Sequence, residues 1–283
     1  MNHNHPSSRI PYASVVVKDL LKDTVLSNAS PPETVKRIPE SDPDIPASPR
    51  RLRKPAKKTP LHPNTPLHFA NAVKGSLKNT TAPYIAQQPY RYYCVLDIEA
   101  TCDENNPSWY NEIIEFPVVL IDAKTLTRVA EFRSFVKPVR NPVLTEFCTR
   151  LTGITQEQVN TAPYFPQVLR NFRHFLKKYH LGTWNMRFIT DGPCDIRDFV
   201  WKTCKANKVS VPSYFRGFVN VRKLAQRNYA HTGIRINFAG MLKLFDLVLE
   251  GRHHSGIDDT RNIARVVLKM MEDGVLFKEH TGY

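Results

Sequence analysis

The stretch YYCVLDIE at residues 92–99 is apolar on both of its alternating faces and ends in two acids. Such a run is typical of a strand in the middle of a sheet that is covered on both sides. Because side chains alternate along a strand, we expect Asp97 and Glu99 to project from the same face, about 6–7 Å apart. Two acids at the end of an apolar strand cost free energy unless a cation or water takes up their charge. The alternative is that the strand has simply reached solvent at this point.

The segments that follow alternate between strand and helix patterns. Further strands are predicted at 113–121, 127–136 and 183–190, and Pro117 requires a bulge or a locally unpaired position in the first of these. A capping box, Thr155 with Gln158, predicts a short helix. Apolar stripes and start signals predict longer helices near 165–179, 195–206, 241–249 and 256–274, and a strand-to-helix passage occupies 218–229. This order favours one α/β domain with a mixed sheet flanked by helices.

The first part of the chain has a different composition. Fourteen of the 22 prolines lie in residues 1–90, which hold few aromatic residues and no apolar period beyond 15–26. Such a segment buries too little apolar surface to offset its chain entropy. We therefore expect a Pro-rich, basic, mostly disordered leader at 1–88 and a folded domain at 89–283. The basic run at 50–58 is either a solvated charge cluster, a nuclear import signal or an extra phosphate contact.

The formal net charge of +14 indicates a polyanionic partner, with nucleic acid favoured over a membrane. The leader holds 13 Lys and Arg against 6 Asp and Glu, so half of the excess, +7, belongs to the folded part. The longest apolar run, Phe116–Ile121, is too short to cross a bilayer, and residues 1–25 do not read as a secretory signal. Five scattered cysteines without a C-x-x-C pair favour a reduced intracellular protein of the cytoplasm, the nucleus or both.

A third candidate acid, Asp195, comes just after the predicted strand at 183–190 and a Gly-Pro turn. Asp195 is expected in the first turn of a helix, where the helix dipole favours an anion. Taken singly, Asp195 is better explained as an ordinary acid at a helix start. Asp191 and Asp198 compete with it for a role in a site.

The last cluster contains His254 and Asp259, at the start of the final predicted helix. Asp259 lies on the edge of the apolar stripe of this helix, and a carboxylate that faces a core needs a partner. His254, one short loop earlier, can project towards the same place, although a histidine beside a helix start is often a surface or capping residue. We expect Ser255 to cap the helix, with Asp258 closing a pattern like a capping box.

Four carboxylates (Asp97, Glu99, Asp195 and Asp259) and His254 are thus predicted at one edge of one sheet. Such a cluster repels itself without a divalent metal, and oxygen ligands with room for water suit Mg²⁺ or Mn²⁺ better than zinc. Two such ions about 3.5–4 Å apart stabilise both the attacking and the leaving oxygen in phosphodiester cleavage. A histidine, with an ordinary pKa of about 6.5, can take the proton of the attacking water.

These five residues, in this order and on these elements, resemble the DEDDh (DnaQ-like) 3′–5′ exonucleases, which have an RNase H-like fold. The flanking residues are similar to the Eri-type branch, which includes the histone mRNA 3′ exonucleases. The motifs that carry this likeness are DIEATC at 97–102, NEIIEFPVVL at 111–120, LTGITQ at 151–156, TDG at 190–192 and DDTRNIAR at 258–265. The similarity covers about residues 91–275.

The resemblance implies an RNase H-like mixed sheet and an exoribonuclease that trims RNA from a free 3′ end, releasing nucleoside 5′-monophosphates. The substrates that it implies include overhangs of small interfering RNA, histone mRNA ends and the 3′ end of 5.8S rRNA. It also implies that Asp97, Glu99 and Asp259 hold two Mg²⁺ or Mn²⁺ ions, with Asp97 between both. Asp195 would support the second ion, directly or through water, and His254 would be the general base.

Trp109 and Tyr110 can line a pocket for the terminal base, or they belong to a loop or the core. Two features depart from the family pattern. Cys194 stands where relatives usually have an aromatic residue, and the leader shows no SAP-like nucleic-acid-binding module. Two other functions stay open: a non-catalytic module on a nuclease fold that binds RNA or protein, and a DNA exonuclease of the same chemistry, because no motif reads the sugar.

Overall fold

The computed structural model describes residues 87–278. The predicted leader, with its basic run at 50–58, therefore lies outside the described residues except for its last two. One of these, Gln88, is tied to the C-terminal segment of the domain. Its side-chain amide donates to the Val275 carbonyl at 2.9 Å, and its side-chain oxygen accepts from the Phe277 amide at 3.0 Å.

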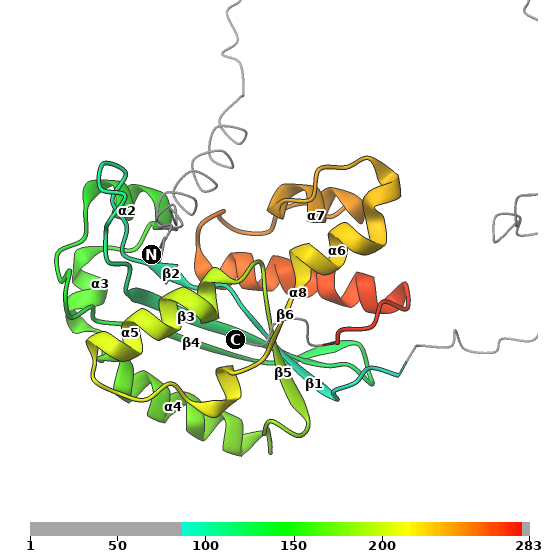
Figure 1. Cartoon of the computed structure of the whole chain (residues 1–283), viewed down its shortest axis with the longest axis horizontal. Coiled ribbons are helices and arrows are strands. Elements are labelled where there is room, and N and C mark those ends of the chain that lie inside the picture. Colours follow the sequence, from blue (N-terminus) through cyan, green and yellow to red (C-terminus); the bar gives the residue numbers. More distant parts are fainter. Residues whose placement is uncertain (1–86, 279–283) are drawn as a thin grey trace, which may run out of the picture. The chain divides into compact units, whose positions relative to one another are not determined.

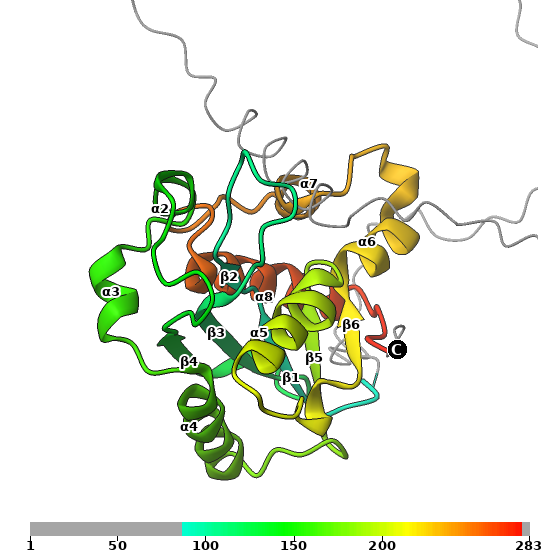
Figure 2. The ribbon, with the colours of Figure 1, turned by 60° about the vertical axis from the view of Figure 1, so that its left-hand side comes forward.

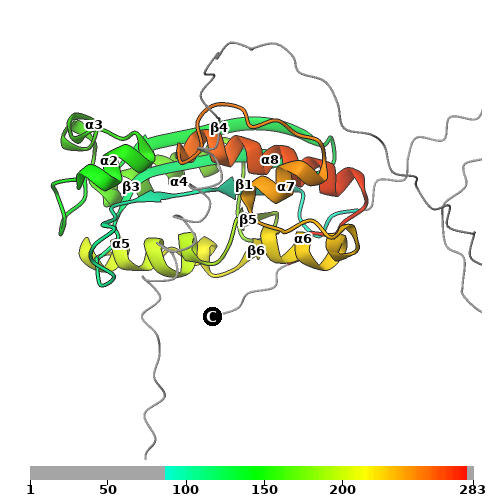
Figure 3. The same cartoon turned by 90° about the horizontal axis from the view of Figure 1, so that it is seen from above.

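The described residues form a six-stranded mixed sheet. The strands are β1 (Tyr92–Leu96), β2 (Glu99–Ala100), β3 (Ile113–Asp122), β4 (Thr127–Phe135), β5 (Met186–Thr190) and β6 (Phe218–Asn220). The central strand β1 pairs antiparallel with β3 and parallel with β5, β4 pairs antiparallel with β3, and β6 pairs parallel with β5. Figure 3 shows the strands in the order β4, β3, β1, β5, β6 from the top of the picture to the bottom.

Helices cover both faces of this sheet (Figures 1 and 2). The α-helices are α2 (Glu146–Thr152), α3 (Gln156–Thr161), α4 (Phe165–Lys178), α5 (Trp201–Ala206), α6 (Val221–Tyr229), α7 (Phe238–Leu244) and α8 (Gly256–Glu272). A π-helical turn, η1 (Asp195–Val200), runs directly into α5, and short 3₁₀ turns lie at η2 (Ser213–Phe215) and η3 (Ala230–Thr232). The α/β architecture predicted from the sequence is confirmed.

The alternation of side chains along β1 divides the core into two parts. Tyr93 and Val95 pack on one face of the sheet together with apolar residues of α6, α7 and α8. Cys94 and Leu96 pack on the other face with residues of α4, η1 and α5. Burying both faces of a strand requires a run without polar alternation, which is why residues 92–96 read as continuously apolar.

The first predicted strand is interrupted after Leu96, which corrects the expectation of one continuous strand at 92–99. β1 ends at Leu96, opposite Val118, and β2 begins at Glu99, opposite Glu115, so the register is the same on both sides of the gap. The gap faces the segment that contains Pro117, which has no amide hydrogen to donate. The unpaired position predicted around Pro117 is thus found in β3, opposite the gap between β1 and β2.

Several predicted helix ends can be compared with the structure. The capping box of Thr155 and Gln158 is present with both of its hydrogen bonds, and Gly274, at a φ of +83°, follows the end of α8. The helix predicted over 241–249 is shorter, because α7 ends at Leu244 and Val248 is 77% exposed. The predicted cap of α8 is wrong, since the Ser255 side chain makes no capping hydrogen bond.

Within residues 87–278, no helix combines the length and the apolar character needed to cross a membrane. All five cysteines lie in this part of the chain and none forms a disulfide.

Candidate active site

In the gap of the central strand, two backbone amides donate hydrogen bonds to side chains from distant elements. The amide of Asp97 donates to Oγ1 of Thr260 on α8 at 3.1 Å. The amide of Ile98 donates to Oδ1 of Asp195 at 2.8 Å. The start of α8 and the start of η1 are therefore both fastened to the end of β1 through the main chain of these two residues.

Asp259 is held in place by the loop that precedes α8. Its Oδ2 accepts a hydrogen bond from the backbone amide of His254 at 2.7 Å, and the backbone of His254 has a positive φ of 63°. Such a conformation is uncommon for a residue other than glycine, and here it turns the amide towards the carboxylate. Asp259 is 2% exposed, which confirms the prediction that this acid faces the interior.

Three carboxylates converge next to the gap. One oxygen each of Asp97, Glu99 and Asp259 lie within 4.8 Å of one another. Burial raises the pKa of each of these acids, and the charge of neighbouring carboxylates raises it further for Asp97 and Glu99. For Asp259, burial also raises the pKa, while the hydrogen bonds and charge from His253 and the amide of His254 act in the opposite direction. A cluster of buried carboxylates whose ionised forms repel one another fits a hard divalent cation, which takes oxygen ligands and neutralises the charge. The resemblance to the DEDDh exonucleases likewise implies divalent metal ions, and these three carboxylates fit them.

Asp195 lies beside this group and is 5% exposed. Burial raises its pKa to about 7, while the hydrogen bond from the Ile98 amide and the charge of Arg222 act in the opposite direction. The charge of Asp195 contributes to the raised pKa of Asp97, so the two carboxylates act on each other. The structure thus brings together all four acids that the sequence singled out.

The two competing acids after β5 each form an ion pair with an arginine. Asp191 forms a bidentate ion pair with Arg222 of α6. Nε of Arg222 donates to Oδ1 of Asp191 at 2.8 Å, and Nη2 donates to Oδ2 at 2.9 Å. Asp198 pairs with its neighbour Arg197 at 2.7 Å. Arg222 was not predicted as a site residue, and it brings positive charge close to Asp97 and Asp195, whose pKa values it lowers. Only the parallel pairing of β5 with β6 brings Arg222 to this position.

His254 lies in the same place as Asp259, as expected. Its ring is buried, and no described residue is within hydrogen-bonding distance of Nε2. Burial, together with the nearby charges of His253 and Arg252, lowers the pKa of His254 to about 3. The ring is therefore held in its neutral form, with one nitrogen free to accept a proton or a metal.

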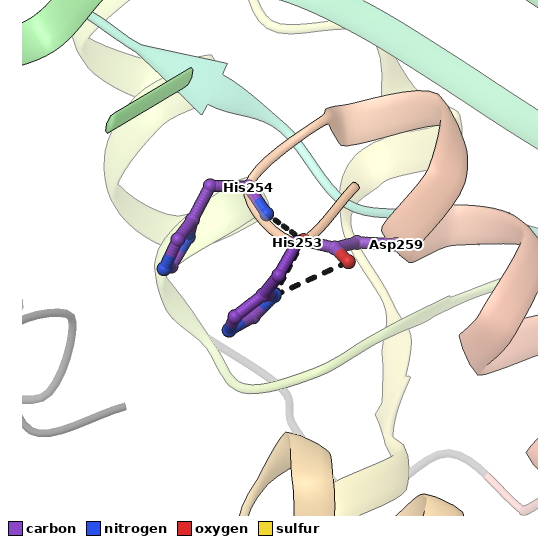
Figure 4. Close-up of side chains that lie close together, drawn as sticks. All are labelled: His253, His254 and Asp259. Carbon is purple, nitrogen blue, oxygen red and sulfur yellow. Dashed lines mark hydrogen bonds and ion pairs between the residues drawn. The ribbon is translucent and has the colours of Figure 1, made fainter. Parts of the chain in front are cut away.

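His253 was missed in the sequence, although its position next to His254 is a signal that could have revealed it. Its Nδ1 lies 3.1 Å from Oδ2 and 3.3 Å from Oδ1 of Asp259. Its ring stacks on Phe238 on one side, with ring centres 4.7 Å apart, and on His254, with centres 3.9 Å apart. Figure 4 shows the two imidazole rings side by side and the contact from His253 to Asp259.

A cavity of about 300 Å³ opens onto these groups. All five predicted site residues line it, together with His253 and the Asp191–Arg222 pair. Its wall also holds the apolar side chains of Phe199 and Phe238 and the amine-bearing Lys223. Acidic groups, a neutral imidazole, aromatic rings and cations around one cavity of this size suit a phosphate ester that carries a base.

Trp109 and Tyr110 do not line this cavity. The hydroxyl of Tyr110 donates to the Lys202 carbonyl at 2.8 Å, and the guanidinium of Arg140 lies 4.2 Å from the centre of its ring. The first of these contacts fastens the loop after β2 to α5, and the second joins it to the segment between β4 and α2. The prediction that the two aromatic residues bind substrate remains a prediction.

The chain is similar to known exonucleases in both sequence and fold. The exonuclease family profile (RNase_T) matches residues 94–267. The chain is 40% identical over 187 residues to mouse "3′-5′ exoribonuclease 1", covering 65% of this chain and 54% of that protein. It thus spans about half the length of this curated relative.

Two solved structures are similar to the chain as well. One is the nuclease domain of 3′hExo, described as a DEDDh family member bound to rAMP, with a TM-score of 0.66 and 36% identity. The match covers 70% of this chain and all of that domain. The other is a 3′-exonuclease described in 3′-end-specific recognition of the histone mRNA stem-loop, with a TM-score of 0.65 and 35% identity over 69% of this chain and 88% of that one.

Proposed function

This chain belongs to the exonuclease (RNase_T) family, and from that membership we propose that it is a metal-dependent 3′–5′ exoribonuclease. One observation carries the proposal: the carboxylates of Asp97, Glu99 and Asp259, far apart in the sequence, lie within 4.8 Å of one another at the wall of a cavity. Buried acids in mutual repulsion destabilise a fold. Their grouping is explained if they serve to hold cations at the place where a phosphodiester is cleaved.

The metal ligands that we propose are Asp97, Glu99 and Asp259, with Asp195 supporting the second of two Mg²⁺ or Mn²⁺ ions. The all-oxygen donor set favours these ions over softer metals. When bound, such a pair of ions supplies Lewis-acid stabilisation of the charge on the attacking and leaving oxygens. The protein itself orients the acids through the bonds of Asp195 to the Ile98 amide and of Asp259 to the His254 amide.

We assign the role of general base to His254. Its Nε2 is buried without a described partner, and its ring lines the cavity beside Asp259. A neutral imidazole in this position accepts the proton of a water molecule that attacks the phosphorus atom. The backbone amide of His254, bonded to Asp259, fixes the distance between the base and the proposed metal ligand.

The proposed substrate is RNA with a free 3′ end, and the products are nucleoside 5′-monophosphates. Histone mRNA ends, overhangs of small interfering RNA and the 3′ end of 5.8S rRNA are the candidates. The net charge of +14 and the cations Arg222 and Lys223 at the cavity favour a polyanionic ligand. Phe199 and Phe238 offer aromatic surface for a terminal base. We propose that the catalytic domain comprises 89–283, that 1–88 is a disordered leader, and that the protein acts in the cytoplasm, the nucleus or both.

The test is digestion of a 5′-labelled RNA by the full-length protein. With Mg²⁺ we expect a ladder of products that shorten by one nucleotide at a time, and EDTA should abolish it. Asp97→Asn should remove the activity, while Asp198→Asn, a matched change at an acid that pairs with Arg197, should keep it.

Three outcomes would contradict the proposal. An intact RNA that is nevertheless retained by the protein would indicate a non-catalytic RNA-binding module. Digestion of the DNA version of the same oligonucleotide at a higher rate would indicate a DNA exonuclease. Full activity of Asp97→Asn would refute the assigned site.

A further inference from the structure

Asp259 belongs to two different groups of potential metal ligands. In the first, its carboxylate lies with those of Asp97 and Glu99, and every donor is oxygen. In the second, it lies with the imidazoles of His253 and His254, and one ligand atom of each of these three residues is within 4.8 Å of the others. Figure 4 shows this second group, with both rings beside the carboxylate.

We propose that His253, His254 and Asp259 form a zinc site, and that Zn²⁺ bound there inhibits the enzyme by withdrawing Asp259 and His254 from Mg²⁺-dependent cleavage. The inference that zinc binds depends only on the geometry of the three side chains. The inhibition rests on the proposed function, because it requires Asp259 and His254 to act in the exonuclease reaction.

The chemistry of the donors separates the two groups. Two imidazole nitrogens and one carboxylate oxygen are a ligand set that zinc commonly takes in proteins, with a fourth position left for water. Nitrogen ligands strongly favour zinc over magnesium, which prefers oxygen and keeps much of its hydration shell. The group with His253 should therefore prefer Zn²⁺, and the group with Asp97 and Glu99 should prefer Mg²⁺.

The distances are close to those of a coordinated cation. Two ligands on one tetrahedral zinc, each about 2.0–2.1 Å from the metal, lie roughly 3.4 Å apart. Nδ1 of His253 is already 3.1 Å from Oδ2 of Asp259, so a cation that replaces the proton shared by this pair needs almost no movement. The third ligand, from His254, has to approach by about 1–1.5 Å at most, a shift that a rotation of the ring can provide.

An independent observation points to a ligand at this place. Nε2 of His254 is buried and has no hydrogen-bond partner among the described residues, and the residue is only 8% exposed. A buried polar nitrogen without a partner costs free energy, which a bond to a metal would recover. Phe238 stacks on the other face of the His253 ring and restricts its rotation, so that His253 loses little side-chain entropy when a cation binds.

The binding test uses the full-length protein and two variants, with competition against a chromophoric zinc chelator as the measurement. His253→Asn keeps a polar group near Asp259, and His253→Phe keeps the stacked ring, but both remove the nitrogen ligand. His174→Asn, at an exposed histidine of α4, is the matched control for the other histidines of the chain. We expect both His253 variants to lose one zinc equivalent or to bind it on the order of tenfold or more weakly, and the control to match the wild type.

Equal zinc binding by the wild type and both His253 variants would overturn the site, as would the absence of a tight zinc equivalent in the wild type. A second readout does not depend on the folding of any variant. Co²⁺ added to the wild type in place of zinc should give the intense visible absorption of a four-coordinate site. A weak, six-coordinate spectrum would contradict the proposal.

The inhibition test measures RNA cleavage at fixed Mg²⁺ with increasing Zn²⁺, each variant being compared with its own rate in Mg²⁺ alone. The wild type and His174→Asn should be inhibited, and the His253 variants should need on the order of tenfold more zinc. Activation by zinc, or equal inhibition of all variants, would refute the inhibitory role. A wild type without any Mg²⁺-dependent cleavage would instead refute the proposed function, and the chelator experiment would still decide whether zinc binds.

Discussion

The carboxylate of Glu115 on β3 caps the helix that begins at Gly256. Its Oε2 accepts from the Gly256 amide at 3.2 Å, its Oε1 accepts from the Ile257 amide at 3.3 Å, and Arg133 donates to Oε1 at 2.7 Å. An anion at a helix start satisfies amides that have no partner within the helix and interacts favourably with its dipole. A residue from the sheet thus replaces the expected cap, Ser255, and fixes the start of α8 against β3, where Glu115 pairs with Glu99 of β2.

The close approach at Gly256 should make this position sensitive to an added methyl group. A Cβ there would lie 3.0 Å from the Asp97 carbonyl oxygen and 3.2 Å from Cγ of Glu99, so these residues must shift by a few tenths of an ångström. We expect Gly256→Ala to lower kcat/KM by about 10-fold, because small displacements of catalytic groups are costly.

The matched control for this change is Gly274→Ala at the other end of α8. Its φ of +83° is strained for alanine, but nothing lies within 4 Å of the added atom. It should lower the free energy of unfolding by about 1 kcal/mol and leave kcat/KM unchanged. If both variants lost activity equally, or Gly256→Ala lost none, the close packing would have no bearing on the site.

Removal of one carboxylate should separate the effects on catalysis and on stability. Asp97→Asn relieves repulsion among buried acids, so we expect a higher Tm than the wild type in EDTA. Addition of Mg²⁺ should raise the Tm of the wild type more than that of the variant, since binding to the native state stabilises it. Cleavage should fall on the order of 10³-fold, corresponding to several kcal/mol of lost charge stabilisation. Thermal unfolding followed by circular dichroism with and without Mg²⁺ tests this, and an equal response of both proteins would contradict it.

Loss of the proposed base should affect the chemical step and not the binding of RNA. We expect His254→Ala to lower kcat by about 10²–10⁴-fold, the usual contribution of a general base, while the Kd for RNA in Ca²⁺ changes little. His231→Ala, at an exposed histidine of η3, serves as the control. Single-turnover kinetics and filter binding give the two quantities. A kcat within a factor of two of the wild type would mean that another group takes the proton.

The ion pair between Asp191 and Arg222 should stabilise the wall of the cavity. The side chain of Asp191 is 6% exposed and that of Arg222 is 29% exposed. Arg222→Gln leaves a buried carboxylate unpaired near Asp97 and Asp195, and we expect it to cost about 2–3 kcal/mol, less than the roughly 3–5 kcal/mol of a completely buried pair.

Asp191→Asn combined with Arg222→Gln removes both charges, so the double variant should regain part of the lost stability. Urea unfolding of the two single variants and the double variant gives the coupling free energy between these side chains. A double variant whose loss equals the sum of the single losses would show that the pair contributes nothing.

The order of the elements could be predicted because it depends on local patterns. The apolar stripe of α4 and the capping box before α3 are set by residues a few positions apart, and the structure contains both. The cavity site was also accessible from the sequence, since Asp97 and Asp195 come after the ends of the parallel strands β1 and β5, where such a sheet gathers side chains at one edge.

The sequence alone therefore determined the mixed α/β sheet and the set of four acids and one histidine at its edge, because burial periodicity and chain order are local properties. Only the tertiary structure decided that the central strand opens opposite the segment with Pro117, that Glu115 replaces Ser255 as the cap, and that His253 contacts Asp259. The gap and the Glu115 cap depend on how the strands pair and how α8 packs on the sheet. The contact of His253 with Asp259 depends on the path of the loop before α8. No spacing along the chain specifies them, because each depends on the positions of several elements at once.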